Sequence, residues 1–369
     1  GKLHLIKTMN CAKDRIEKAF SKRSHVIHIA FLYNKASLEW FYLFFFYALI
    51  TIQGVNAQDL RFTQYHASDT YLNPAFAGSA GDPGITINFR DQWPDMPQTY
   101  ISYRVALSLP INVLSSGVGV YVIQDNQGNG VLKSFRMGGQ YMYQLRFSKK
   151  LAMNYGIDAS LVQRQLSWND LQFYDQINFL TGFSDASGLP NPTNEPVPPS
   201  LSKNFFDIGL GTALVSTNWY LGLSAAHILQ PNLSFYNDKE SKLPIAVTGQ
   251  AGVIMYNKKR GNPLYVNPLL VITSQGKSNQ LLIGSYFNKG AFYPGIFLKH
   301  NFNSFSDVCF SVGLKKGLLS FAYSYDLSLG SLSGNSGGSH ELSFIVNWKT
   351  RSTKQSNKNR DILKCPRFF

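Results

Sequence analysis

Long runs of alternating polarity dominate the sequence after residue 84. In residues 99–109, apolar Tyr103 and Val105 alternate with polar Ser102 and Arg104. Successive side chains of a β-strand point to opposite faces, so this alternation predicts a strand with one apolar and one polar face. Because no run changes to the 3.6-residue period of a helix, the sequence predicts an all-β fold from residue 85 onward.

The runs are too long for an ordinary soluble sheet. Strands of soluble domains have about five or six residues, whereas strands that cross a membrane need about 9–11. Most of the runs reach that length, and aromatic residues, which favour strands, make up 14% of the chain. Fourteen runs follow one another, at residues 85–93, 99–110, 113–126, 131–147, 150–166, 205–217, 218–229, 245–257, 263–276, 279–289, 291–303, 306–317, 318–333 and 338–349.

The connections between these runs alternate in length. Long loops, among them 167–204 and 230–244, follow odd-numbered runs, whereas short turns such as 148–150 follow even-numbered runs. Outer-membrane barrels have this asymmetry, and their closed sheet pairs every backbone group, as lipid requires. The sequence therefore predicts an up-and-down antiparallel transmembrane β-barrel of about fourteen strands over residues 85–349. We expect it in the outer membrane of a Gram-negative cell, in contact with the membrane lipids.

An uncharged run precedes the barrel. Residues 1–57 form a basic segment, in which the run from Trp40 to Ile52 carries no charge. Thirteen residues are too few for a membrane-spanning helix, which needs about 20. The run is typical of a signal peptide, and the small residues Val55 and Ala57 favour cleavage after Ala57. An uncleaved membrane anchor is the alternative.

Two further segments flank the barrel. Residues 58–84 are rich in turns, because Asn73, Pro74 and Gly78 interrupt any strand, and we expect them to lie in the periplasm or in the barrel lumen. Residues 350–369 form a basic tail. We expect this tail to be a flexible periplasmic extension that ends in a short hydrophobic and basic segment.

Arginines recur on the polar face of the predicted strands, which faces the lumen of a barrel. One hypothesis is that they bind a partner protein inside the lumen. The other is that they pair with lumen acids such as Asp158 and hold the wall together. The arginines concerned are Arg90, Arg104, Arg136, Arg146 and Arg164.

No motif of an enzyme or a cofactor site is found. The Gly276–Ser278 turn lacks the first glycine of a phosphate-binding loop, and Cys309 and Cys365 lack the spacing of a zinc site. The net charge of +14 is scattered, so nucleic-acid binding is not expected. No carboxylate or serine lies near a histidine in the sequence at a spacing that would make a catalytic base; the histidines concerned are His66, His227, His300 and His340.

Short motifs at both ends of the predicted mature chain carry a family resemblance. They are Phe62–Tyr65, Tyr71–Ser79, Arg90–Pro94, Tyr325–Leu329, Gly338–Leu342 and Cys365–Phe368. In these motifs the chain resembles the PorP/SprF family of type IX secretion and gliding-motility proteins of Bacteroidota. The residues that match the family pattern most directly are Gln64, Tyr65, Asn73, Pro74, Ala75, Gly78, Arg90, Gln92, Trp93, Ser339, His340 and Glu341.

The resemblance implies an outer-membrane barrel that works with the type IX secretion machinery. Its partners would be the C-terminal domain of a secreted adhesin and components of the periplasmic ring. A porin that lets small solutes diffuse through an open lumen is an alternative. A structural anchor whose basic tail binds periplasmic components is another.

Overall fold

The computed structural model describes residues 59–67, 69–236, 241–256, 264–302, 305–329, 333–348, 363 and 365. The expected signal peptide and its cleavage site, and the tail apart from residues 363 and 365, lie outside these residues. Among the described residues, no helix has the length and hydrophobicity needed to cross a bilayer.

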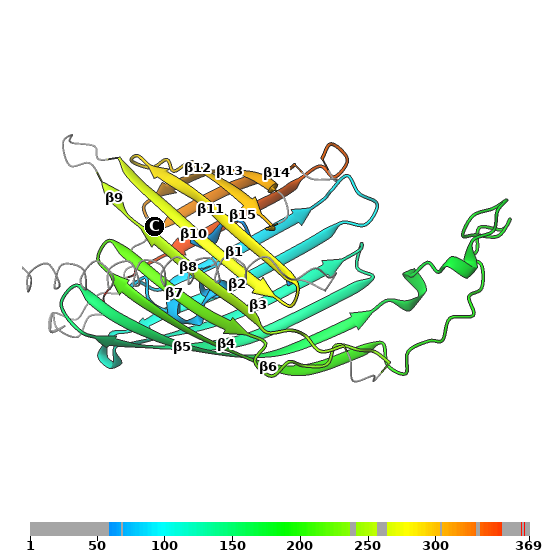
Figure 1. The fold of residues 1–369 in the computed structure, drawn as a ribbon, viewed down its shortest axis with the longest axis horizontal. Helices are drawn as coiled ribbons and strands as arrows, with labels where there is room; N and C mark the ends of the chain where they lie inside the picture. The colour runs from blue at the N-terminus through cyan, green and yellow to red at the C-terminus, as the bar shows by residue number, and fades with distance from the viewer. Residues whose placement is uncertain are drawn as a thin grey trace, which may run out of the picture. The chain divides into compact units, whose positions relative to one another are not determined.

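Fifteen strands make one antiparallel sheet (Figure 1). Apart from β8 and β9, which do not pair with each other, each described strand pairs with its neighbours in the sequence, as expected of an up-and-down barrel. The strands are β1 (Gly84–Gln92), β2 (Tyr100–Ile111), β3 (Ser116–Gln127), β4 (Leu132–Arg146), β5 (Leu151–Leu166), β6 (Ser202–Ser216), β7 (Trp219–Ala226), β8 (Ala246–Val253), β9 (Met255–Tyr256), β10 (Tyr265–Gln275), β11 (Ser278–Asn288), β12 (Gly295–His300), β13 (Phe305–Lys316), β14 (Leu319–Ser328) and β15 (Ser339–Asn347).

The sheet closes on itself. β1 pairs with β2 on one side and with β15 on the other, so the first and last strands meet at a seam. β8 and β9 both pair with β10 and continue one line of the wall on either side of Ile254. The result is the closed barrel of fourteen strands that the sequence predicts.

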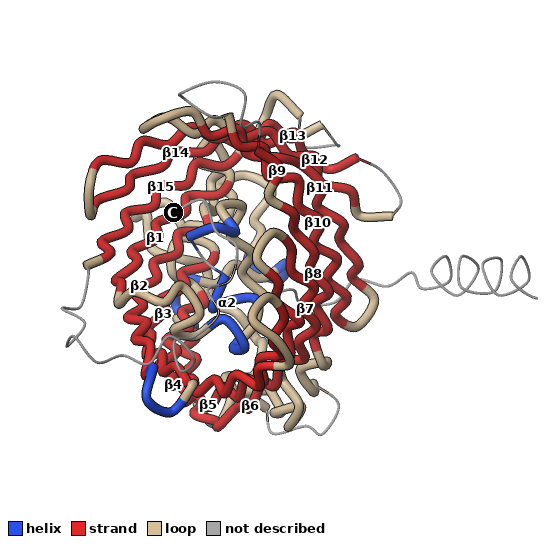
Figure 2. The backbone as a smooth tube through the Cα atoms, turned by 90° about the vertical axis from the view of Figure 1, so that its left-hand side faces the viewer, coloured by secondary structure: helices blue, strands red, loops and turns tan. Residues whose placement is uncertain are grey.

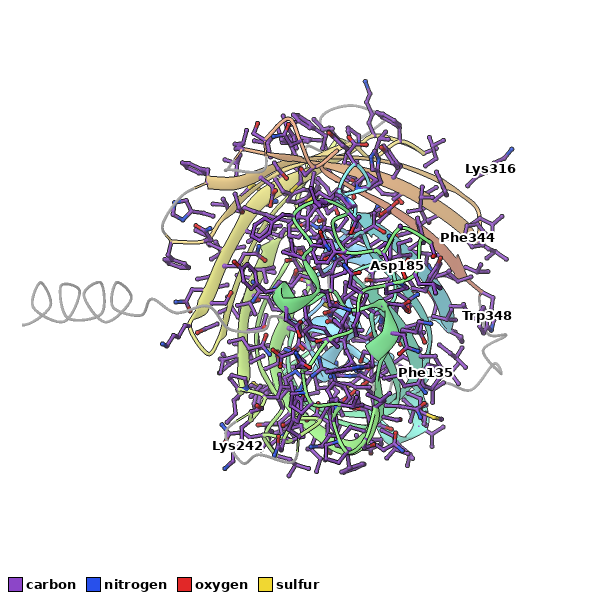
Figure 3. The ribbon with its side chains drawn as sticks, turned by 90° about the vertical axis from the view of Figure 1, so that its right-hand side faces the viewer. Phe135, Asp185, Lys242, Lys316, Phe344 and Trp348 are labelled. Carbon is purple, nitrogen blue, oxygen red and sulfur yellow. The ribbon has the colours of Figure 1, made fainter. Side chains whose placement is uncertain are left out.

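The two faces of the wall follow the predicted alternation. In β2, Tyr103 and Val105 point outward and are each 47% exposed, whereas Ser102 and Arg104 point into the lumen and are buried. Phe135 and Phe344 point away from the barrel on other strands (Figure 3). The outer wall is therefore apolar and suited to lipid, and the inner wall is polar.

Several strands are shorter than predicted, and three of them show where the regular pairing stops. β12 begins only at Gly295, after Pro294, which has no backbone N–H to donate to a neighbouring strand. β7 ends at Ala226, since the next residue, His227, has a left-handed φ of 59°. β14 ends at Ser328, well before the glycine- and serine-rich loop that the predicted run included.

The described residues before β1 lie inside the barrel (Figure 2). Residues 59–83, which we term the lumen segment, contain three short helices, η1 (Tyr65–Ala67), α2 (Asp69–Leu72) and η2 (Pro74–Phe76). Most of their side chains are buried against the inner wall. Of the two expected places for this segment, the periplasm and the lumen, the structure shows the lumen.

Outward-facing positions give a test of the membrane-spanning wall. Val120 lies mid-strand in β3 and points outward. Val120→Arg should lower the free energy of unfolding in phospholipid bilayers by about 2–4 kcal/mol, because a charge would face hydrocarbon. Urea titration in bilayers measures this change. Leu189→Arg, in an exposed loop, is the matched control, and equal losses for the two variants would contradict a lipid-facing position for Val120.

Candidate functional site in the plugged lumen

Four buried charges from four strands meet in the lumen. Arg90 of β1 contacts Asp326 of β14 at 2.9 Å and Glu341 of β15 at 3.2 Å. The amine of Lys299 on β12 lies 2.8 Å from the same Asp326 carboxylate. We term Arg90, Lys299, Asp326 and Glu341 the charge cluster. With two cations and two anions it is balanced, which a buried set of charges requires.

The lumen segment completes the hydrogen bonds of the charge cluster. The Thr63 hydroxyl accepts from Arg90 at 3.0 Å and from Lys299 at 2.7 Å, and donates to Asp326 at 2.7 Å. The backbone N–H groups of Thr63 and Gln64 donate to the Glu341 carboxylate at 2.7 and 3.0 Å. The cluster therefore holds residues 63 and 64 against the wall.

Strand register explains why these residues meet. Arg90 and Glu341 are opposite one another across the β1–β15 seam, and Ser324 faces Glu341 from β14. The Gln64 side chain donates to the Ser324 hydroxyl at 3.1 Å and to the Glu341 carbonyl at 2.8 Å. Four motifs far apart in the sequence thus supply one site, to which Lys299, in no motif, adds the second cation.

Other motif residues at the seam connect the end of β1 to the start of β15. Gln92 pairs with Ser339 in register, and the Trp93 N–H donates to the Gly338 carbonyl at 2.8 Å. His340 points to the other side of the wall from Glu341, where its ring contacts the Tyr323 hydroxyl at 2.8 Å. These residues do not join the charge cluster.

The Asn73–Gly78 stretch is a second part of the lumen segment that is bound to the wall. The Asn73 side chain caps η2 by accepting from the Ala75 N–H at 2.9 Å, and it donates to the Thr212 carbonyl of β6 at 3.1 Å. Asn154 of β5 donates to the Ala75 carbonyl at 3.0 Å. Gly78 adopts a φ of 69°, which favours glycine, and its N–H donates to Ser108 at 2.7 Å.

Glycines on the inner wall make room for this stretch. A side chain at Gly156 of β5 would overlap the backbone of Pro74 and Ala75, and one at Gly211 of β6 would overlap Asn73. The wall and the lumen segment therefore touch through backbone, without space for a methyl group between them. Within its own strand, each of these glycines only weakens the strand. Its role as a close contact is not visible in the local sequence, because the contacting residues come from a distant segment.

The two described residues of the tail, Leu363 and Cys365, also lie in the lumen. Leu363 exchanges two hydrogen bonds with the Gln144 side chain, at 2.6 and 3.0 Å. The Cys365 N–H donates to the Ser79 carbonyl at 3.0 Å, and the residue packs with Ala75 and Phe76. The expectation of a tail that extends away from the barrel is wrong for these two residues, because they find backbone and apolar partners inside it.

The first described residue, Asp59, is bound at the opposite end of the lumen. Asp59 pairs with His227, and the Gln275 side chain donates to its carboxylate at 2.9 Å. Burial opposes ionisation of Asp59, but His227, Arg136 and Gln275 together outweigh it and hold the pKa of Asp59 well below its usual range. His227 also lies 2.7 Å from Asp207. The reading of His227 as isolated from carboxylates is wrong, because Asp207 comes from the neighbouring strand β6 and Asp59 from the lumen segment.

Three of the five predicted lumen arginines adjoin the lumen segment or its contacts. Arg90 belongs to the charge cluster. Arg104 donates to the Thr70 hydroxyl at 2.6 Å and lies over the Tyr71 ring. Arg136 lies 3.7 Å from Asp207, which binds His227. The remaining two, Arg146 on β4 and Arg164 on β5, are half-buried, and Arg164 interacts electrostatically with Asp59 of the lumen segment.

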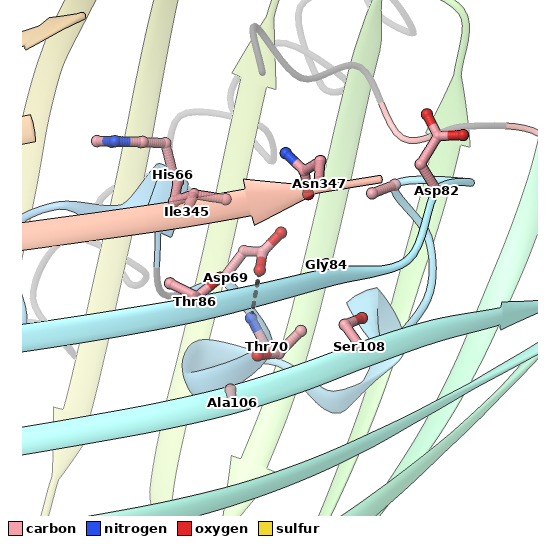
Figure 4. A pocket seen from close by; sticks show the side chains of 11 residues that line it. His66, Asp69, Thr70, Asp82, Gly84, Thr86, Ala106, Ser108, Ile345 and Asn347 are labelled. Atoms are coloured by element: carbon pink, nitrogen blue, oxygen red, sulfur yellow. Dashed lines mark hydrogen bonds between the residues drawn. The ribbon is translucent and has the colours of Figure 1, made fainter. Parts of the chain in front are cut away.

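Small cavities lie between the described part of the lumen segment and the wall. A cavity of about 40 Å³ is lined by His66, Thr70 and Asp82 of the segment and by residues of β1, β2 and β15 (Figure 4). A second cavity, beside Tyr71 and Arg104, also has a volume of about 40 Å³. Each has room for a few water molecules at most. Within the described ranges, no three His, Cys, Asp or Glu side chains are grouped to hold a metal ion.

A closed antiparallel sheet with an apolar outer wall and a lumen filled by its own chain defines a plugged outer-membrane β-barrel. The chain belongs to the PorP/SprF family, since the model for "Type IX secretion system membrane protein PorP/SprF" matches residues 54–346. It is thus a type IX secretion membrane protein of the outer membrane. No curated protein sequence matches it.

Solved barrels resemble the chain distantly. The toluene transporter TbuX of Ralstonia pickettii has 10% identity and a TM-score of 0.44, over 76% of this chain and 94% of its own. TodX of P. putida has 8% identity and a TM-score of 0.42, over 76% and 93%. Omp33 of Acinetobacter baumannii has 7% identity and a TM-score of 0.38, over 74% and 100%.

The charge cluster gives a test of how the lumen segment is held. Glu341→Gln should lower the free energy of unfolding by about 3–5 kcal/mol, because it leaves the two buried cations, Arg90 and Lys299, with the single carboxylate of Asp326. Urea titration in bilayers measures the loss. Glu195→Gln, at an exposed loop position, is the matched control and should change stability by less than about 0.5 kcal/mol. Unfolding midpoints that coincide for the two variants would contradict a stabilising role for Glu341.

Proposed function

We propose that this protein assists the secretion or surface anchoring of a partner adhesin, by binding the adhesin's C-terminal domain and contacting the periplasmic ring of the type IX machinery. The proposal rests on one observation. Residues 59–83 occupy the lumen, and the charge cluster binds them to the wall. A barrel closed by its own chain is suited to binding a partner, whereas a diffusion channel needs an open path.

The lumen arginines divide between two roles in this proposal. Arg90, Arg104 and Arg136 support the lumen segment or its contacts, as the hypothesis of a wall held by ion pairs expects. Arg90 pairs with Asp326 and Glu341, and Arg136 pairs with Asp207. Asp158, the expected acid, interacts electrostatically with Arg136. Arg146 and Arg164 keep the proposed role of binding the partner domain.

The two ends of the barrel suit different partners. Outer-membrane barrels place long loops outside the cell and short turns in the periplasm. The short turns here carry lysines, among them Lys149 and Lys316, beside the mouth where Leu363 and Cys365 enter. This basic end suits contact with lipid headgroups or with the periplasmic ring, and the long loops suit contact with the secreted adhesin.

Displacing the lumen segment tests the proposed function in cells. Gly156→Ala places a methyl group against the backbone of Pro74 and Ala75, so it should displace the Asn73–Gly78 stretch. We expect surface display of the adhesin, measured by antibody labelling of intact cells, to fall several-fold while the amount of barrel in the outer membrane stays the same.

The matched control is Gly209→Ala, on the inner wall of β6. Its added methyl group would have ordinary contacts, the nearest being the Ala225 carbonyl and the Asp158 side chain at 3.4 Å. Display should therefore stay at the wild-type level. Full display in cells that lack the protein altogether would overturn the proposed function.

Conductance separates this proposal from a porin. The wild-type barrel should show little steady conductance in planar bilayers, because the lumen segment fills its interior. Removal of residues 59–83 should raise the conductance, with folding of the variant checked by its heat-modifiable mobility. A large, steady conductance of the wild-type protein would favour the porin alternative.

A further inference from the structure

The loop between β5 and β6 forms an arm with hydrogen bonds of its own. Residues 167–201, which we term the arm, extend beyond the ends of these strands (Figure 1). Gln176 and Asn191 exchange hydrogen bonds between side chain and backbone at 2.6 and 2.7 Å. Near the base, the Tyr236 hydroxyl donates to the Pro196 carbonyl at 2.7 Å. These contacts give the arm a defined shape outside the membrane-spanning wall.

The tip of the arm presents apolar side chains to solvent. Asn178 and Gly182 pair through two backbone hydrogen bonds of 2.8 Å, and the turn between them carries Phe179 and Leu180. Phe179 is 101% exposed, Leu180 94% and Tyr174 90%. Exposed apolar groups gathered in one place on a soluble surface mark interaction sites, and aromatic residues are frequent anchors of such sites.

The charge of the arm indicates the chemistry of its partner. The arm contains Asp170, Asp175, Asp185 and Glu195 and no Lys or Arg, although the whole chain carries a net charge of +14. Asp185 lies on the arm with its side chain exposed (Figure 3). Four acids disfavour adsorption to an anionic lipid surface, and they favour a protein surface with basic residues around an apolar pocket.

We propose that the arm is the docking element for the secreted protein, which binds it with an apolar pocket rimmed by Lys and Arg. Phe179 and Leu180 enter the pocket, and the acids of the arm face its basic rim. This inference rests on the proposed function for the identity of the partner. The apolar tip, the negative charge and the position outside the barrel are properties of the described residues of the arm itself.

Cysteine labelling in intact cells tests the docking. Thr181→Cys adds a thiol beside Phe179 and Leu180 without removing either, and Cys309 and Cys365 are buried. Asn335→Cys, exposed in the loop between β14 and β15, is the control at the same end of the barrel. A membrane-impermeant maleimide should label Thr181→Cys several-fold more slowly than Asn335→Cys in cells, and equally fast in the purified protein.

Additional variants identify what covers the tip. Phe179→Ser with Leu180→Ser, or Asp185→Asn with Glu195→Gln, introduced beside Thr181→Cys, should each restore fast labelling in cells. Deletion of the adhesin should restore it as well. Fast labelling of Thr181→Cys in cells that display the adhesin would overturn the docking proposal, and so would protection that persists without the adhesin. The proposed function has its own test, because it fails if surface display of the adhesin does not depend on this protein.

Discussion

The contact of Thr63 and Gln64 with the charge cluster is the interaction on which the arrangement of the lumen depends. Removing four charges from water carries a large desolvation cost, which is offset only where every partner is present. The wall supplies both cations and both carboxylates, but the Glu341 carboxylate receives two of its hydrogen bonds from the backbone of the lumen segment. The wall and the segment therefore stabilise each other, and neither has its polar groups satisfied alone.

The strands and their faces could be predicted because they follow from local rules. Period two places Arg104 inward and Val105 outward without any knowledge of the neighbouring strand, and the length of each run distinguishes a membrane barrel from a soluble sheet. The strand ends were less predictable. Pro294 and the left-handed backbone of His227 interrupt the regular strands at single residues, within runs whose alternation continues.

The site itself was harder to predict, because its contacts join residues far apart in the chain. Lys299 shares the inward face of β12 with Gly295 and Phe297, so nothing in its own strand indicates a charged partner. His227 gained its carboxylates from Asp207 on the neighbouring strand β6 and from Asp59, which lies 168 residues away in the lumen segment. The family motifs pointed to Gln64, Arg90 and Glu341, but not to the fact that they meet.

The position of the charge cluster at the β1–β15 seam has a consequence for assembly. These strands come from opposite ends of the barrel sequence, and a one-residue slip between them would turn Glu341 toward lipid. Residues 63 and 64 bridge to that seam from inside, so they select the register in which it closes. Once the seam is formed, the surrounding wall encloses the segment. The segment therefore enters the lumen before or during closure of the seam. The step that closes the barrel is then also the step that requires the lumen segment to be in place.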